Sequence, residues 1–79
     1  MWQELLRNPK DVNFNDLLVL CEKYFDEYRV RDSHYIFKTP WQGDPRINLQ
    51  KAGKKAKPYQ VRQVRKAIER LEGIYDEEV

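Results

Sequence analysis

The chain has 79 residues and a net charge of +2, and a chain of this length buries only roughly 60 % of its unfolded surface, which excludes two separate hydrophobic cores. One cysteine excludes an internal disulfide, and the sequence has neither a His/Cys cluster with metal-ligand spacing nor an apolar run that could span a membrane or serve in a signal peptide. We therefore expect one small cytoplasmic domain without a metal or another cofactor.

The first predicted helix follows a short N-terminal segment. Residues 1–12 are expected to form an arm, because Pro9 interrupts any helix there. Apolar residues then recur at intervals of three and four, which predicts an amphipathic helix capped by Asn13 or Asn15. Cys21 lies on the apolar face, so we expect a buried thiol rather than a nucleophile. The apolar positions are Phe14, Leu17, Leu18, Cys21, Tyr24, Phe25 and Tyr28.

Three β-strands are expected in the middle of the chain. Residues 28–31 and 35–39 are β-prone runs separated by Asp32 and Ser33, which are both turn formers, so a hairpin is predicted. A loop containing proline and glycine follows. Residues 46–51 then alternate polar and apolar side chains, as expected of a half-buried strand.

The alternation of side chains along the second strand predicts where the only histidine points. Tyr35 and Phe37 share one face, while His34, Ile36 and Lys38 share the other. Two large aromatic residues outweigh one isoleucine, so we expect the aromatic face to lie on the core and His34 to face solvent or a ligand. If Ile36 faced the core instead, His34 would turn inward with it.

A basic turn and a second helix complete the predicted order. Residues 52–57 lead to Pro58, which suits the first position of a helix. An apolar stripe is then expected on this helix, formed by Val61, Val64, Ile68, Leu71 and Tyr75. The order α-β-β-β-α predicts an α+β two-layer domain, in which two helices cover one face of a three-stranded antiparallel sheet. We expect an arm (1–12), a single domain (13–75) and an acidic tail (76–79).

Positive charge is concentrated in the second half of the chain. The formal charge is −2 over residues 1–32, +8 over residues 33–70 and −4 over residues 71–79. Such a segment is typical of a surface that binds a polyanion, although a solvated helix face has the same composition. Cations before a helix N-terminus favour phosphate, so the primary RNA contacts are predicted to be Lys54, Lys55 and Lys57. Along the helix, this surface would extend to Arg62, Arg65 and Lys66.

His34 is the candidate catalytic residue. An imidazole exchanges protons near neutral pH, and beside a cationic surface it fits a small ribonuclease, in which the 2′-hydroxyl of RNA attacks the adjacent phosphorus without a metal. Water, Tyr59 or a lysine is the candidate for a second proton-transfer group. A solitary histidine is more often a surface or packing residue, so the motif around it has to be considered.

Together, these features resemble the HicA (YcfA-like) toxins of bacterial toxin–antitoxin systems. The resemblance covers roughly residues 14–72 and is carried by Ser33-His34-Tyr35-Ile36-Phe37, by Thr39-Pro40-Trp41, and by Lys57-Pro58-Tyr59 at the start of a basic helix. It implies a fold similar to the double-stranded-RNA-binding domain and an endoribonuclease (mRNA interferase) that cleaves mRNA with one histidine of a Gly-Ser-His motif. The catalytic role then falls on His34, with Ser33 as its motif neighbour.

The motif departs from the family at one position and implies a partner. Asp32 replaces the usual glycine, which could remove a positive-φ conformation or put a carboxylate near His34. The resemblance further implies a HicB-type antitoxin that masks the active face and carries the operator-binding domain, so that the toxin meets DNA only indirectly.

Two other functions are compatible with the sequence. A noncatalytic double-stranded-RNA-binding module also begins its second helix with a lysine cluster resembling residues 53–57. The acidic side of the first predicted helix, which would repel a duplex, argues against it; its carboxylates are Asp16, Glu22, Asp26 and Glu27. A pure protein-interaction domain would leave His34 neutral to mutation.

Overall fold

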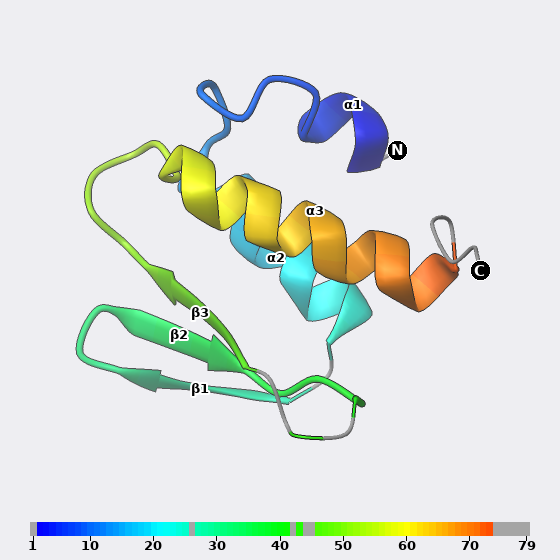
Figure 1. Cartoon of the computed structure of the whole chain (residues 1–79). Coiled ribbons are helices and arrows are strands. Elements are labelled where there is room, and N and C mark those ends of the chain that lie inside the picture. Colours follow the sequence, from blue (N-terminus) through cyan, green and yellow to red (C-terminus); the bar gives the residue numbers. More distant parts are fainter. Residues whose placement is uncertain (1, 26, 42, 44–45, 74–79) are drawn as a thin grey trace.

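The computed structural model describes residues 2–25, 27–41, 43 and 46–73. Its elements are α1 (Trp2–Leu5), α2 (Phe14–Tyr24), β1 (Tyr28–Arg31), β2 (His34–Phe37), β3 (Ile47–Gln50) and α3 (Pro58–Glu72). The strands form an antiparallel sheet in the order β1-β2-β3, and the helices lie on one side of it (Figure 1). The prediction of a small α+β domain with a three-stranded antiparallel sheet is confirmed. Tyr75 and the predicted tail lie outside the described residues.

The two long helices begin and end at residues suited to these positions. Asn13 is the N-cap of α2, because its Oδ1 accepts a hydrogen bond from the Asn15 backbone N–H at 2.9 Å. Lys57 precedes α3, and Pro58 occupies its first turn, as predicted. Gly73 ends α3 with a φ of 69°, a left-handed conformation that glycine adopts without strain.

The hairpin between β1 and β2 turns on two residues. Arg31 lies opposite His34, which leaves Asp32 and Ser33 as the turn. Asp32 has a φ of 57° and is the only non-glycine residue with positive φ in the described part of the chain. An aspartate therefore adopts the positive-φ conformation that glycine would adopt without strain.

Replacing Asp32 with glycine should stabilise the fold. A left-handed L-residue costs roughly 1–2 kcal/mol, of which the extra entropy of glycine in the unfolded chain offsets a part. We expect Asp32→Gly to raise the free energy of unfolding by about 0.5–1 kcal/mol, which corresponds to a melting temperature several degrees higher, on the order of 4–8 °C per kcal/mol. Thermal circular dichroism measures this. Ser33→Gly is the matched control, because φ at Ser33 is not positive, and it should destabilise; equal shifts in both variants would contradict the argument.

The core lies between the sheet and the helices. Phe37, Ile47 and Leu49 point from the sheet into it and are at most 3 % exposed. Tyr35 is partly buried, with its ring centroid 5.6 Å from that of Phe14. The aromatic face of β2 is thus the core face, as predicted. The helices contribute Phe14, Leu17, Leu20, Cys21, Val61, Val64, Ala67 and Ile68.

The segment expected to be an arm packs into this core. It contains α1 and buries Trp2, Leu6 and Val12 with the residues of α2 and α3. The Trp2 indole N–H donates to Glu72 Oε1 at 3.1 Å, at the far end of the chain. The Ala56 N–H donates to the Val12 carbonyl at 2.8 Å, which ties the segment to the loop before α3. The structure therefore adds α1 to the predicted order of elements.

Cys21 is a core residue, as predicted. Its side chain is buried in α2. Burial, and secondarily the adjacent charge of Glu22, raises the pKa of the thiol to about 12. A thiol that stays protonated at neutral pH is not a nucleophile.

Candidate nucleic-acid interface

The sheet has a polar face turned away from the helices, which we call the outer face. Side chains alternate along a strand, so the neighbours of the buried Phe37, Ile47 and Leu49 point outward. Cross-strand register then fixes the whole set, which comprises Arg29, Arg31, His34, Ile36, Asn48 and Gln50. Each of these side chains is exposed or half-buried. His34 faces outward, as predicted.

His34 occupies the middle of a cross-strand row. Arg31 lies opposite it on β1, and Gln50 lies opposite it on β3. Its Nδ1 is 3.1 Å from the amide oxygen of Asn48. An amide oxygen only accepts, so Nδ1 is the donor, and a ring with a single N–H then has its lone pair on Nε2. Asn48 thereby selects the tautomer that a general base requires.

A shallow pocket joins His34 to the start of α3. It is lined by His34, Asn48, Gln50, Tyr59, Gln60 and Gln63. The fully buried Gln60 closes its inner side, with its Nε2 3.4 Å from the Gln50 carbonyl. Tyr59 is 55 % exposed, so its ring borders the pocket with access to solvent. Of the predicted candidates for a second proton-transfer group, Tyr59 shares the pocket with His34, and no described lysine lines it.

The two arginines of β1 are site residues that the sequence analysis missed. Arg29 and Arg31 share the outer face with His34, and neither makes an ion pair with a described residue. They were overlooked because the net charge of residues 1–32 is negative, so that segment was not considered as a cationic surface. The alternation of arginine with apolar residues, followed by a two-residue turn, was the available signal. A two-residue turn pairs Arg31 with His34 and puts both arginines on the outer face.

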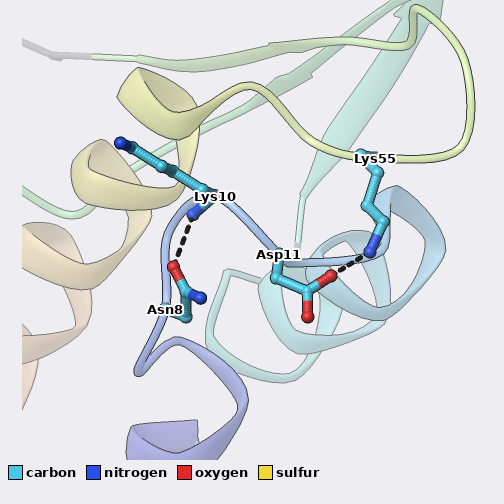
Figure 2. Close-up of polar contacts among 4 residues, drawn as sticks. All are labelled: Asn8, Lys10, Asp11 and Lys55. Carbon is cyan, nitrogen blue, oxygen red and sulfur yellow. Dashed lines mark hydrogen bonds and ion pairs between the residues drawn. The ribbon is translucent and has the colours of Figure 1, made fainter.

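The predicted lysine cluster lies in the loop between β3 and α3, at the same end of the sheet as His34. The Phe14 N–H donates to the Lys54 carbonyl at 2.8 Å, which holds this loop against the start of α2. Lys55 forms an ion pair with Asp11, next to the turn in which the Lys10 N–H donates to Asn8 Oδ1 at 3.1 Å (Figure 2). The charge of Lys55 is therefore offset locally. Lys54 and Lys57 are exposed, and neither forms an ion pair with a described residue.

The cations of α3 form a continuous exposed surface along the helix. Lys66 and Arg70 border a second hollow beside Trp41, and the Arg70 guanidinium lies 4.3 Å from the centre of the Trp41 ring. Arg62 lies three residues before Arg65 and four before Lys66, so these side chains are neighbours on the helix surface. Arg65 Nε is 3.4 Å from Glu69 Oε2. The predicted extension along Arg62, Arg65 and Lys66 is therefore one exposed side of α3 next to Tyr59, where Glu69 partly offsets the charge of Arg65.

Ser33, the motif neighbour of His34, lies in the turn and joins the sheet through its backbone carbonyl. Its carbonyl accepts a hydrogen bond from the Lys51 N–H at 3.0 Å and extends the β2–β3 ladder by one residue. This bond fixes the start of β2, and hence the direction of His34. The side chain is half-buried.

Two further observations concern metals and membranes. Within the described residues, no three His, Cys, Asp or Glu side chains gather where they could hold a metal ion. No helix in the same part of the chain is long and apolar enough to cross a bilayer.

Comparison of the chain with protein-family models, with curated proteins and with solved structures gave no match. The function of this chain is therefore inferred from the geometry around His34 and from the motifs of the sequence.

Proposed function

We propose that this protein is a metal-independent endoribonuclease of the HicA type, a toxin that cleaves mRNA with His34. The observation that carries the proposal is the placement of His34 on the outer face, hydrogen-bonded to Asn48 and flanked by Arg31. Proton transfer and phosphate binding are thereby combined on one accessible surface. A cytoplasmic location follows from an mRNA substrate.

The reaction that fits this arrangement is intramolecular transesterification. His34 Nε2 takes the proton of the RNA 2′-hydroxyl, the 2′-oxygen bonds to phosphorus, and the bond to the 5′-oxygen breaks. The leaving 5′-oxygen takes a proton from Tyr59 or water, which gives a 2′,3′-cyclic phosphate and a free 5′-hydroxyl. Arg31, which lies opposite His34, would stabilise the negative charge that develops on the phosphate. General acid–base catalysis of this kind contributes about 10²–10⁴-fold.

A fold like that of the double-stranded-RNA-binding domain is part of the proposal. The order of α2, the three strands and α3 supports it, as does the sheet order β1-β2-β3. A noncatalytic module of that class is the second candidate function, because Lys54 and Lys57 flank the N-terminus of α3 and lack ion pairs with described residues. The exposed Asp16 and Glu22 on α2 would repel a duplex laid along that helix, which favours the enzyme.

Cleavage of a structured mRNA in EDTA tests the proposal. We expect wild-type protein to cut the RNA and leave 2′,3′-cyclic phosphate ends, and His34→Ala to lose at least roughly 100-fold in rate while retaining RNA binding. Lys23→Ala, which removes an exposed cation of α2 outside the proposed RNA-binding surface, is the matched surface control, and circular dichroism verifies folding of all three proteins. Equal cleavage by His34→Ala would refute the role of His34. Salt-dependent binding without cleavage by wild type would favour the noncatalytic module.

The toxin proposal includes a HicB-type antitoxin that covers the outer face and contacts operator DNA on behalf of the complex. Since it would neutralise the cations that hold the substrate, antitoxin and RNA should exclude one another.

A further inference from the structure

β1 is an edge strand with free hydrogen-bonding groups. The Lys38 N–H donates to the Glu27 carbonyl at 3.0 Å, which fixes the alternation along the β1–β2 ladder. The backbone groups of Arg29 and Arg31 therefore face β2, while those of Tyr28 and Val30 point away from the sheet. No described residue pairs with these outward groups. The opposite edge differs, because Gln60 contacts the Gln50 carbonyl there.

The side chains of β1 are also uncovered. Tyr28 is 40 % exposed and Val30 is 53 % exposed, although both lie on the helix side of the sheet. Figure 1 shows β1 as the strand farthest from α3. Tyr28 is nevertheless fixed, because its ring stacks on Phe37 at 4.7 Å and its hydroxyl donates to Glu22 Oε2 at 2.8 Å. The edge thus offers an ordered apolar side and, through Arg29 and Arg31, a cationic side.

We propose that the β1 edge binds an extended segment of a partner protein by strand addition. The segment places acidic side chains beside Arg29 and Arg31 and apolar side chains beside Tyr28 and Val30. Outward N–H and C=O groups next to exposed apolar side chains match a polypeptide strand better than a phosphate backbone. The strand surface and its charge do not depend on the proposed ribonuclease activity.

Charge makes a second copy of this chain a poorer occupant than an acidic segment. Two copies paired antiparallel through the outward groups can overlap most of β1 in two registers. In one register Arg29 lies opposite Arg29, while Glu27 lies opposite Arg31. In the other register Arg29 lies opposite Arg31. Like charges directly opposite one another destabilise a sheet, and charged edge strands are a known protection against self-association. An acidic segment of another protein would instead place carboxylates beside Arg29 and Arg31, where they attract the two guanidinium groups.

The location of this edge connects binding to the proposed function. Arg31 lies opposite His34, so carboxylates brought to Arg29 and Arg31 would neutralise the cations next to the imidazole. A partner bound at β1 therefore competes with RNA without covering His34 itself. This consequence rests on the proposed function, whereas strand binding does not.

The test is titration of the ¹⁵N-labelled full chain with an octapeptide of alternating glutamate and valine. We expect slower hydrogen exchange at the Tyr28 and Val30 amides and an unchanged rate at Asn48 on the other edge. The double variant Arg29→Glu/Arg31→Glu should lose at least roughly tenfold in affinity and should bind the peptide with lysine in place of glutamate. Arg62→Glu, one charge reversal away from the edge, should bind as wild type does.

Absence of protection at Tyr28 and Val30 would overturn the proposal, and so would three other results. Protection at Asn48, or equal loss of affinity in Arg62→Glu, would mean that the peptide binds elsewhere or by net charge alone. Protection of Tyr28 and Val30 by an RNA oligonucleotide without peptide would make nucleic acid the occupant. Peptide binding at β1 by a protein that fails to cleave RNA would remove the ribonuclease proposal and leave this one standing.

Discussion

Trp2→Ala is expected to lower the free energy of unfolding by about 3–5 kcal/mol, the usual cost of truncating a buried aromatic residue. Trp2 is 5 % exposed, and its indole N–H donates to Glu72. The per-residue range for small proteins gives a chain of this length a total stability of about 4–12 kcal/mol. The loss is therefore a large fraction of the total stability, and the midpoint of urea denaturation followed by circular dichroism should fall in proportion.

Two variants separate the causes of this loss. Trp2→Phe keeps most of the apolar contact area and removes the hydrogen bond to Glu72, so it should cost about 1–2 kcal/mol. Gln3→Ala changes an exposed neighbour in the same helix and should stay within about 0.5 kcal/mol of wild type. A melting temperature of Trp2→Ala within a few degrees of wild type would mean that the first twelve residues are not part of the core.

The N-terminal segment shows what a local sequence pattern does not reveal. Helices α2 and α3 were predictable because their apolar residues repeat over eleven and fifteen positions, respectively. Residues 2–12 have too few apolar side chains for a period, and Pro9 interrupts them. Their position depends on contacts with distant residues, such as Trp2 with Glu72 and Asp11 with Lys55. Such contacts leave no trace in the spacing of neighbouring residues.

In the candidate site, too, the local pattern was predictable and the contacts between distant residues were not. The alternation of one strand was enough to place His34 on the outer face. Its hydrogen bond to Asn48 and its position opposite Arg31 depend on the register between the strands. The two-residue turn predicted the β1–β2 register, but no local pattern predicted the β2–β3 register. Nothing in the sequence indicated that Lys55 is paired. It was predicted to contact RNA, but it forms an ion pair with Asp11, which is far away in sequence.

A double-mutant cycle on His34 and Asn48 is expected to show that the two residues act as a unit. His34→Ala should reduce cleavage by about 10²–10⁴-fold. Asn48→Ala should reduce it by about tenfold, because a ring without its Nδ1–H acceptor rotates and populates the tautomer that blocks Nε2. Added to His34→Ala, Asn48→Ala should then have no further effect, since there is no imidazole left to orient.

Gln50→Ala is the matched control for this cycle. Gln50 lies directly opposite His34 on the same face, and the ring bonds to Asn48 instead. Imidazole ¹⁵N shifts provide a readout independent of cleavage: the Nδ1–H form should dominate in wild type and Gln50→Ala, and the Nε2–H form in Asn48→Ala. An equal cost of Asn48→Ala with and without His34 would assign Asn48 to RNA contact or to folding. Because the tautomer is measured without substrate, Asn48 can orient His34 even in a protein that binds RNA and does not cut it.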